Sequence, residues 1–297
     1  MKKGFRWLFM GLMIIGLAGC KGGSSEAVSE GPKKLDWQFD VGDDVVTGET
    51  EGAGEWSPTY KVNLKIVGGG DTVLFNGTVT LKSPAMMGSE FLKAAVTEKG
   101  LAQEGIDTGF VTTLGDYTNN AEDNIYWTFT VNGASSDWGV NQYQMRNNDY
   151  MLWTYAVVDW NAPPVVPERE TGDWCFEVGA DRVTAESEGA SDWSPTYKVN
   201  LKVVGGGNDV LFNGIVTLKS PTMMGSEFLK AAVTEKGLAQ EGIDTGFVTT
   251  LGDYTNNAED NIYWGFTVNG VSSDWGVNQY QMRDGDYMLW TYAEMVW

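Results

Sequence analysis

Apolar and polar residues alternate along several short segments of the chain, and these segments predict β-strands. The period of two runs over residues 60–66, 73–81 and 125–131, which is typical of a strand with one buried face. Three glycines and an aspartate at 68–71 favour a tight turn, so we expect the first two strands to form a hairpin. Two further strands are predicted at 110–114 and 150–155, and an acidic strand region at 37–46 precedes the hairpin.

One segment has a helical period instead. Ser89 is a suitable N-cap, Glu90 follows in the first turn, and Gly100 stands where helices commonly stop. The apolar stripe of this helix consists of Phe91, Leu92, Ala95 and Val96. The order of hairpin, helix and three strands predicts an α+β, β-grasp-like domain, in which a mainly antiparallel sheet packs on one helix.

The chain contains this unit twice. At an offset of 137 residues, 36–160 aligns with 173–297 without a gap, and 105 of the 125 positions are identical. We therefore predict two tandem β-grasp-like repeats, at 35–160 and 172–297, joined by a proline-rich linker at 161–171. Identity this high reports a recent duplication and carries no information about functional constraint.

The residues before the first repeat predict secretion. Residues 1–19 combine a basic start, an apolar run too short to span a bilayer, and small residues before Cys20. This ending resembles the lipobox of bacterial lipoproteins, which implies cleavage before Cys20 and a lipid on its sulfur; an ordinary signal peptide with a chance cysteine is the alternative. Residues 20–34 predict a flexible tether. We therefore expect an extracytoplasmic, membrane-anchored lipoprotein, on the cell surface or the outer membrane.

Composition and charge exclude several classes of function. The 297 residues include no histidine, which removes histidine-based catalysis and every metal site that needs imidazole. A formal net charge of −20 disfavours nucleic acid and anionic lipid as partners. No phosphate-binding loop, dinucleotide fingerprint, nucleophile elbow or paired-cysteine motif occurs. We expect no enzymatic activity, no catalytic residue, no metal site and no cofactor.

Three segments in order carry a family resemblance: residues 109–115, 126–133 and 139–155, which recur at 246–252, 263–270 and 276–292. With the helix before them, they resemble the C-terminal β-domain of transcobalamin and intrinsic factor, a domain also found in bacterial surface proteins. In the vertebrate carriers this domain and a helical barrel enclose cobalamin, and no barrel is present in this sequence. The resemblance implies a β-grasp fold and a corrinoid ligand.

The loop at 115–124 and a second polar loop hold the candidate binding residues. By the resemblance, the first loop faces the ligand, where Tyr117 covers a ring and Asn119 and Asn120 bond to amides. Trp138 lies in a polar loop and is the best candidate for an exposed aromatic side chain. The equivalent residues of the second repeat are Tyr254, Asn256, Asn257 and Trp275.

Each candidate has a plainer alternative. The composition of the loop at 115–124 favours a solvated strand connection, because Asn and Asp are common in turns. A calcium site is a third possibility, with Asp116, Asn119, Glu122 and Asp123 as ligands. Trp138 can serve as a lid on the core. Trp56 is predicted to pack at a strand entry. The seven carboxylates at 36–55 indicate a solvated face, with cation binding as the alternative.

These observations predict a lipid-anchored extracytoplasmic binding protein that captures cobalamin or another corrinoid through aromatic and amide side chains. The alternative is a surface lipoprotein that binds a protein or a carbohydrate, in which two similar repeats gain avidity.

Overall fold

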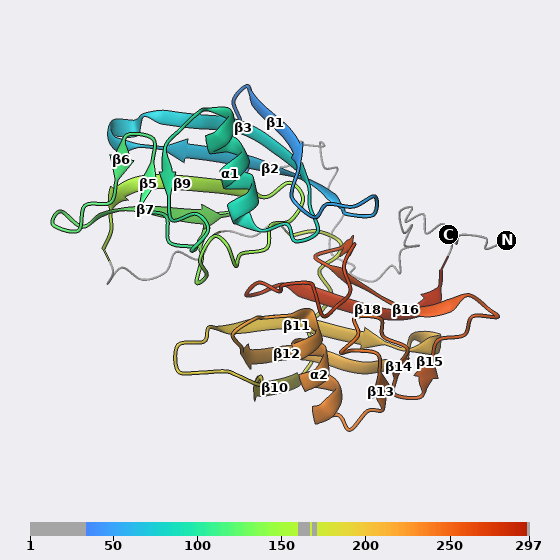
Figure 1. Ribbon diagram of the computed structural model, residues 1–297. Coiled ribbons are helices and arrows are strands. Elements are labelled where there is room, and N and C mark those ends of the chain that lie inside the picture. Colours follow the sequence, from blue (N-terminus) through green and yellow to red (C-terminus); the bar gives the residue numbers. More distant parts are fainter. Residues whose placement is uncertain (1–33, 160–166, 168–170, 296–297) are drawn as a thin grey trace, which may run out of the picture. The chain divides into compact units, whose positions relative to one another are not determined.

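The computed structural model describes residues 34–159, 167 and 171–295. The signal peptide, Cys20, nearly all of the tether and most of the linker lie outside the described residues. The chain divides into two compact units, one holding residues 27–170 and the other 171–297, and each is described by itself (Figure 1). Over the described ranges, no helix is long and apolar enough to cross a membrane.

The first repeat is built on a six-stranded sheet. The strands are β1 (Asp44–Glu49), β2 (Thr59–Val67), β3 (Val73–Lys82), β7 (Ile125–Val131), β8 (Ala134–Ser135) and β9 (Tyr150–Val157). Their order across the sheet is β1-β3-β2-β9-β7-β8. The helix α1 (Gly88–Glu98) packs on one face of this sheet, against β3, β1 and β2 (Figure 1). A short helical turn, η1 (Gly69–Asp71), joins β2 to β3.

A smaller three-stranded sheet lies between α1 and β7 in the sequence. It consists of β4 (Gln103–Glu104), β5 (Thr113–Leu114) and β6 (Tyr117–Thr118), paired in that order. Both pairs are antiparallel, and β5 is the central strand. This small sheet sets the position of the loop that was predicted to face a ligand.

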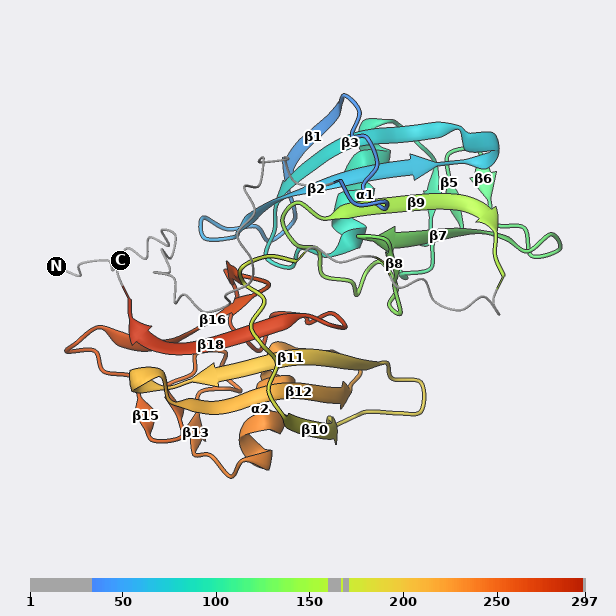
Figure 2. The same ribbon diagram turned by 180° about the vertical axis from the view of Figure 1, so that it is seen from behind.

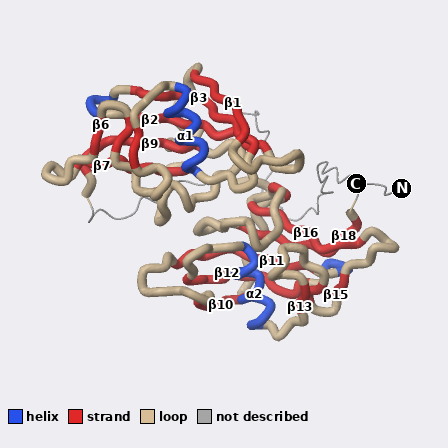
Figure 3. The backbone as a smooth tube through the Cα atoms, in the orientation of Figure 1, coloured by secondary structure: helices blue, strands red, loops and turns tan. Residues whose placement is uncertain are grey.

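The second repeat has the same architecture. Its large sheet has the order β10-β12-β11-β18-β16-β17. These strands are β10 (Asp181–Glu186), β11 (Thr196–Val204), β12 (Val210–Lys219), β16 (Ile262–Val268), β17 (Val271–Ser272) and β18 (Tyr287–Glu294). The helix is α2 (Gly225–Glu235), the turn is η2 (Gly206–Asn208), and the small sheet holds β13 (Gln240–Glu241), β14 (Thr250–Leu251) and β15 (Tyr254–Thr255). Figure 3 shows one such helix against the strands of each repeat.

The large sheet is mainly antiparallel, as expected, but two of its five strand pairs are parallel. β2 pairs with β3 in the antiparallel sense, but β9 runs parallel to β2, and β1 runs parallel to β3. The parallel pair of β2 and β9 arises because the chain crosses the sheet through α1 before it returns beside β2. Figure 2 shows the sheets from the side opposite the helices.

Two local predictions need correction. The helix begins at Gly88 and its N-cap is Met87, so Ser89 is not the cap. The Glu90 carboxylate instead accepts a 2.8 Å hydrogen bond from the Met87 backbone N–H, which supplies half of a capping box. The strand predicted at 110–114 is limited to Thr113 and Leu114, because residues 109–112 form a loop.

The core lies between the large sheet and the helix. One face of β2 contributes Val62, Leu64 and Ile66, all fully buried, and the helix contributes the apolar stripe expected from its sequence. The Trp153 ring stacks on Phe129 with the ring centres 4.8 Å apart. Each large buried apolar side chain contributes about 1.5 to 3 kcal/mol relative to exposure, so the core accounts for the alternating pattern of the strands.

Ahead of β1, the chain covers part of the opposite face of the sheet. Trp37 and Phe39 both pack edge-on against Tyr150 of β9, with ring centres 5.7 and 5.2 Å apart. The acidic strand predicted at 37–46 is therefore shorter than expected: residues 36 and 37 lie in a turn, and the chain enters the sheet only at Asp44.

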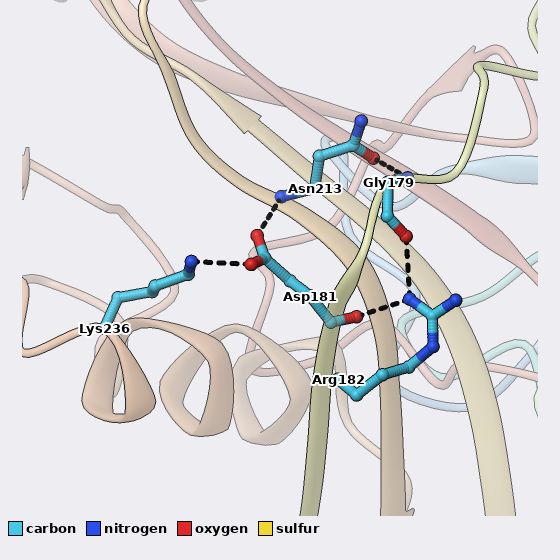
Figure 4. A network of polar contacts seen from close by, with 5 residues as sticks. All are labelled: Gly179, Asp181, Arg182, Asn213 and Lys236. Atoms are coloured by element: carbon cyan, nitrogen blue, oxygen red, sulfur yellow. Dashed lines mark hydrogen bonds and ion pairs between the residues drawn. The ribbon is translucent and has the colours of Figure 1, made fainter.

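A polar clasp fixes the edge strand of each repeat. In the second repeat, Asp181 Oδ2 accepts a 2.8 Å hydrogen bond from the Asn213 backbone N–H, and Asp181 Oδ1 pairs with Lys236 Nζ at 2.6 Å (Figure 4). Burial raises the pKa of Asp181, but the hydrogen bonds and the charge of Lys236 outweigh it and hold the pKa below its usual range. The clasp ties β10 to β12 and to the end of α2.

The first repeat has the same clasp. Asp44 accepts from the Asn76 backbone N–H at 2.8 Å and pairs with Lys99 Nζ at 2.5 Å. The net effect is again a lowered pKa, with burial acting in the opposite direction. Gly77 faces this clasp without a side chain, because a Cβ there would lie 1.8 Å from the Asp44 carbonyl oxygen. The clasp fixes the strand that leads into the loop at 50–58.

Candidate functional site

Tyr117 is packed into the end of the large sheet. Its ring lies on Gly68 and Gly69, where a Cβ on Gly68 would stand 2.3 Å from the ring. Its hydroxyl donates to the Gly69 carbonyl oxygen at 3.3 Å. The ring also contacts Trp127 and Tyr155, with centres 6.4 and 5.4 Å apart. The side chain is half-buried, so only part of it remains for any ligand.

Asn119 and Asn120 are engaged inside the fold. Asn119 Nδ2 donates to the Val111 carbonyl oxygen at 3.1 Å, and its Oδ1 accepts from the Trp127 backbone N–H at 2.8 Å. Asn120 Oδ1 accepts from the backbone N–H of residues 122 and 123, and its Nδ2 donates to Asp123 at 2.7 Å. These amides hold the loop at 115–124, which we call the amide loop. Their role in ligand binding stays a prediction.

The second repeat keeps these contacts and adds one. Asn256 and Asn257 make the same hydrogen bonds as their counterparts, and the Tyr254 ring lies on Gly205. The Tyr254 hydroxyl also donates to Asp209 Oδ2 at 3.1 Å, and this hydrogen bond raises the pKa of Tyr254 above its usual value. A threonine occupies the position of Asp209 in the first repeat.

Trp138 lies at the other end of the strands. Tyr117 contacts Trp127 near the start of β7, whereas the loop of Trp138 follows the far end of β7, where the Asn132 backbone N–H donates to the Tyr150 carbonyl oxygen. From residue 127 to 132 a strand extends about 17 Å. The structure therefore does not bring Tyr117 and Trp138 into one site. Trp138 and Trp275 are both half-buried.

The structure reveals an exposed aromatic residue beside Trp138. Phe110 is 57% exposed, and its equivalent Phe247 is 56% exposed. The loops of Phe110 and Trp138 meet backbone to backbone: the Val140 backbone N–H donates to the Gly109 carbonyl oxygen at 3.2 Å, and a Cβ on Gly139 would lie 3.0 Å from the Gly109 Cα. We call residues 105–112 and 136–142 the paired loops, with 242–249 and 273–279 as their equivalents.

Exposure of Phe110 was not expected, because residues 110–114 fit the pattern of a strand. Two glycines, at 105 and 109, have positive φ of 85° and 87° and bend the chain away from that strand. Their spacing is the signal that favours a loop. A loop places Phe110 in solvent, whereas a central strand would have packed it.

Trp56 corrects another expectation. It was predicted to pack at a strand entry, but it is 68% exposed, and its equivalent Trp193 is 94% exposed. The reason is local: Ser57 and Pro58 turn the chain into β2 only after Trp56, so the tryptophan stands on the connection and outside the sheet.

The carboxylates of the described residues do not gather into a metal site. In this part of the chain no group of three or more acidic, cysteine or histidine side chains is placed to hold an ion. The calcium site suggested for the amide loop is therefore not assembled, because Asp116, Glu122 and Asp123 do not converge and Asn119 bonds to the backbone.

Comparisons with known proteins give two findings. The model of a family described as "Domain of unknown function (DUF4430)" matches residues 89–156 and 225–294, once in each repeat. Among solved structures, the chain is similar to the crystal structure of a "putative metal binding protein" from Ruminococcus gnavus, at 20% identity and a TM-score of 0.27, over 34% of this chain and 99% of that chain. No curated protein matches the sequence.

The family match supports the division into two tandem repeats. Each matched region begins at the helix and ends in the last strand of the large sheet, so it includes the amide loop and both paired loops in full. It does not include the connection that carries Trp56 or Trp193.

Proposed function

We propose that this chain is an extracytoplasmic binding protein without chemistry of its own, held at a membrane by a lipid on Cys20. Each repeat captures a ligand at its paired loops, through Phe110 and Trp138 in the first repeat and Phe247 and Trp275 in the second. The proposal depends on one observation: an aromatic residue with more than half of its surface exposed stands next to a half-buried tryptophan loop in both repeats.

The ligand that we propose is a corrinoid. The observed strand order, with a hairpin, a crossing helix and a final strand parallel to β2, supports a β-grasp fold of the transcobalamin type, as the sequence resemblance implies. A corrin ring offers apolar faces that aromatic side chains can cover. Since Asn119 and Asn120 bond inside the fold, the amide arms of the corrinoid would bond mainly to backbone groups of the paired loops.

Calorimetry of the full chain in detergent solution tests this assignment. Cyanocobalamin is titrated into the wild type and into a variant with Phe110→Ser, Trp138→Ser, Phe247→Ser and Trp275→Ser. We expect saturable heat from the wild type and none from the variant, with Trp56→Ser plus Trp193→Ser as the matched control that retains binding. Circular dichroism verifies that the variants fold.

The other outcomes identify the competing functions. If neutral oligosaccharides give heat of binding and cyanocobalamin gives none, the ligand is a sugar, which also stacks on aromatic side chains. Binding of neither ligand would overturn small-molecule capture and favour a surface interaction protein.

The membrane anchor has a separate test. Cells that express the full chain are labelled with a palmitate analogue and separated into membrane and soluble fractions. We expect label and membrane association in the wild type and loss of both in Cys20→Ser, because a thioether-linked lipid needs the cysteine sulfur. Membrane association of an unlabelled Cys20→Ser variant would contradict the anchor.

A further inference from the structure

The connection between β1 and β2 is a compact loop with a defined conformation in both repeats. We call residues 50–58 and 187–195 the Trp loops. In the first, the Ser57 backbone N–H donates to the Gly54 carbonyl oxygen at 3.1 Å, and the Gly54 backbone N–H donates to Ser57 Oγ at 2.9 Å. Both ends of the loop bond to the end of β3: Thr50 to the carbonyl oxygen of Lys82, and Pro58 to the N–H of Ser83.

The second Trp loop repeats this conformation. The Ser194 backbone N–H donates to the Ser191 carbonyl oxygen at 3.0 Å, and the Ser191 backbone N–H donates to Ser194 Oγ at 2.9 Å. A loop held at both ends and closed by its own serine presents the residue before that serine in a fixed place. That residue is Trp56 in one repeat and Trp193 in the other.

The two tryptophans contribute almost nothing to the cores. Trp56 is 68% exposed and Trp193 is 94% exposed, whereas Trp153 and Trp290 in the sheets are each 2% exposed. Tryptophan is enriched at the centres of protein interfaces because it offers a large, rigid surface that can be desolvated at low entropic cost. An indole presented in this way on a rigid loop is suited to contact a partner.

The charges around each Trp loop select the kind of partner. Glu49, Glu51 and Glu55 lie on or directly before the first loop, and the second has Glu186, Glu188 and Asp192. Among the described residues, each set has one ion pair: Lys82 lies 3.9 Å from Glu49 and Lys219 lies 3.9 Å from Asp192. One lysine therefore offsets only part of the negative charge of each set. Each loop therefore places an exposed indole in a negative field.

We propose that the Trp loops dock a lysine- or arginine-rich segment of a protein partner. A guanidinium or ammonium group lies over the indole face, where the ring quadrupole attracts it, and the neighbouring carboxylates pair with further cations of the segment. The net charge of −20 accelerates the encounter with such a partner. This surface is separate from the paired loops and does not depend on the ligand proposed for them.

Two other occupants fit the loops less well. An anionic membrane surface is repelled by the two carboxylates on each loop and by the third directly before it. A small quaternary ammonium ligand is normally held by a cage of several aromatic rings, and each Trp loop contributes one aromatic residue. A basic peptide matches both the single indole and the row of carboxylates, and two loops on one chain allow it to bind with avidity.

The test uses the full chain in detergent solution and an octa-arginine peptide as the probe, with affinity measured by fluorescence anisotropy at 150 mM salt. The decisive variant is Trp56→Ala plus Trp193→Ala, which leaves the net charge unchanged. We expect at least a tenfold loss of affinity in this variant and a smaller loss when only one tryptophan is replaced. Unchanged affinity in the double variant would overturn the proposal.

A matched pair of charge variants separates docking from general attraction between opposite charges. Glu55→Gln with Asp192→Asn removes two carboxylates from the Trp loops, and Glu122→Gln with Glu259→Gln removes two from the amide loops. We expect a several-fold loss for the first pair and almost none for the second; equal losses would contradict a defined site. Tryptophan-dependent binding to neutral lipid vesicles, without binding to the peptide, would assign the loops to a membrane. Cyanocobalamin binding should be unaffected in every one of these variants.

Discussion

The amide loop and the Trp loop use polar and aromatic residues in opposite ways. In the amide loop, both asparagines bond within the fold, and Tyr117 lies on two glycines. In the Trp loop, the serine closes the turn and the tryptophan is left in solvent. Both loops are polar and acidic and carry one aromatic residue, so these features do not separate a loop that builds the fold from a loop that is available to a partner. The two loops differ in the partners of their side-chain hydrogen bonds and in the exposure of their aromatic residue.

The first prediction concerns Asn119, whose side-chain amide bonds to two backbone groups. Asn119→Ala leaves the Trp127 N–H and the Val111 carbonyl without their partner, in a part-buried place. We expect the free energy of unfolding of the first repeat to fall by about 2 to 3 kcal/mol. Urea unfolding followed by circular dichroism measures it, and Ser57→Ala in the Trp loop is the control, with an expected loss of about 1 kcal/mol or less. A larger loss in Ser57→Ala than in Asn119→Ala would contradict the prediction.

The second prediction concerns the packing of Tyr117 on glycine. A Cβ at residue 68 would lie 2.3 Å from the Tyr117 ring, so Gly68→Ala should destabilise the repeat by about 1 to 3 kcal/mol through overpacking. The double variant with Tyr117→Ala removes the obstruction, so the two losses should not add. A double-mutant cycle with thermal unfolding checks this. Additive losses would mean that the ring moves aside freely and remains available to a ligand.

The third prediction uses pH to distinguish the supports of the two loops. The edge strand that leads into the Trp loop is held by Asp44, whose pKa is below its usual value of about 3.8. The amide loop is held mainly by the uncharged amides of Asn119 and Asn120, with one hydrogen bond to Asp123. A lowered folded-state pKa means that this stabilisation is present above the unfolded-state pKa and is lost as the pH falls through the folded-state value.

We expect this stabilisation to be below about 1 kcal/mol, because the ion pair between Asp44 and Lys99 is partly exposed. We expect hydrogen exchange between pH 5 and pH 3 to show β1 losing protection before β5 and β6. The Asp44→Asn variant should lack this difference. Simultaneous loss of protection in both loops of the wild type would refute the assignment.

The smallest expected effect on stability belongs to the Trp loops. Trp56→Ala with Trp193→Ala should change the free energy of unfolding by less than about 0.5 kcal/mol, because both side chains are largely exposed. Chemical denaturation measures it. A loss above 1 kcal/mol would show that these tryptophans support the fold, and the docking surface proposed for them would then need another explanation.

Much of the architecture follows from local patterns in the sequence. The period of two over 125–131 corresponds to β7, and the helix stripe is buried as its spacing indicates. Strand direction was not predictable in this way, because alternation is identical in parallel and antiparallel strands. The direction of β1 and β9 depends on how the loop at 50–58 and the helix cross the sheet.

The candidate site was only partly accessible from the sequence. The tryptophan at 138 was correctly placed on a loop, but Phe110 was assigned to a strand, and Trp56 was expected to pack at a strand entry. The resemblance suggested that Asn119 and Asn120 face a ligand. In the folded chain these amides meet backbone groups eight residues away in sequence or next to them in their own turn, and no pattern of composition reveals such a partner.

By itself, the amino-acid sequence determined the duplication, the helix and the main strands of each large sheet, and the apolar residues that fill each core, because these depend on local period and on residue identity. Only the tertiary structure decided which polar and aromatic side chains the fold uses and which it leaves exposed. The physical reason is that a hydrogen bond or a ring contact depends on atoms brought together by chain crossings, and the position of those crossings is not encoded in any single segment.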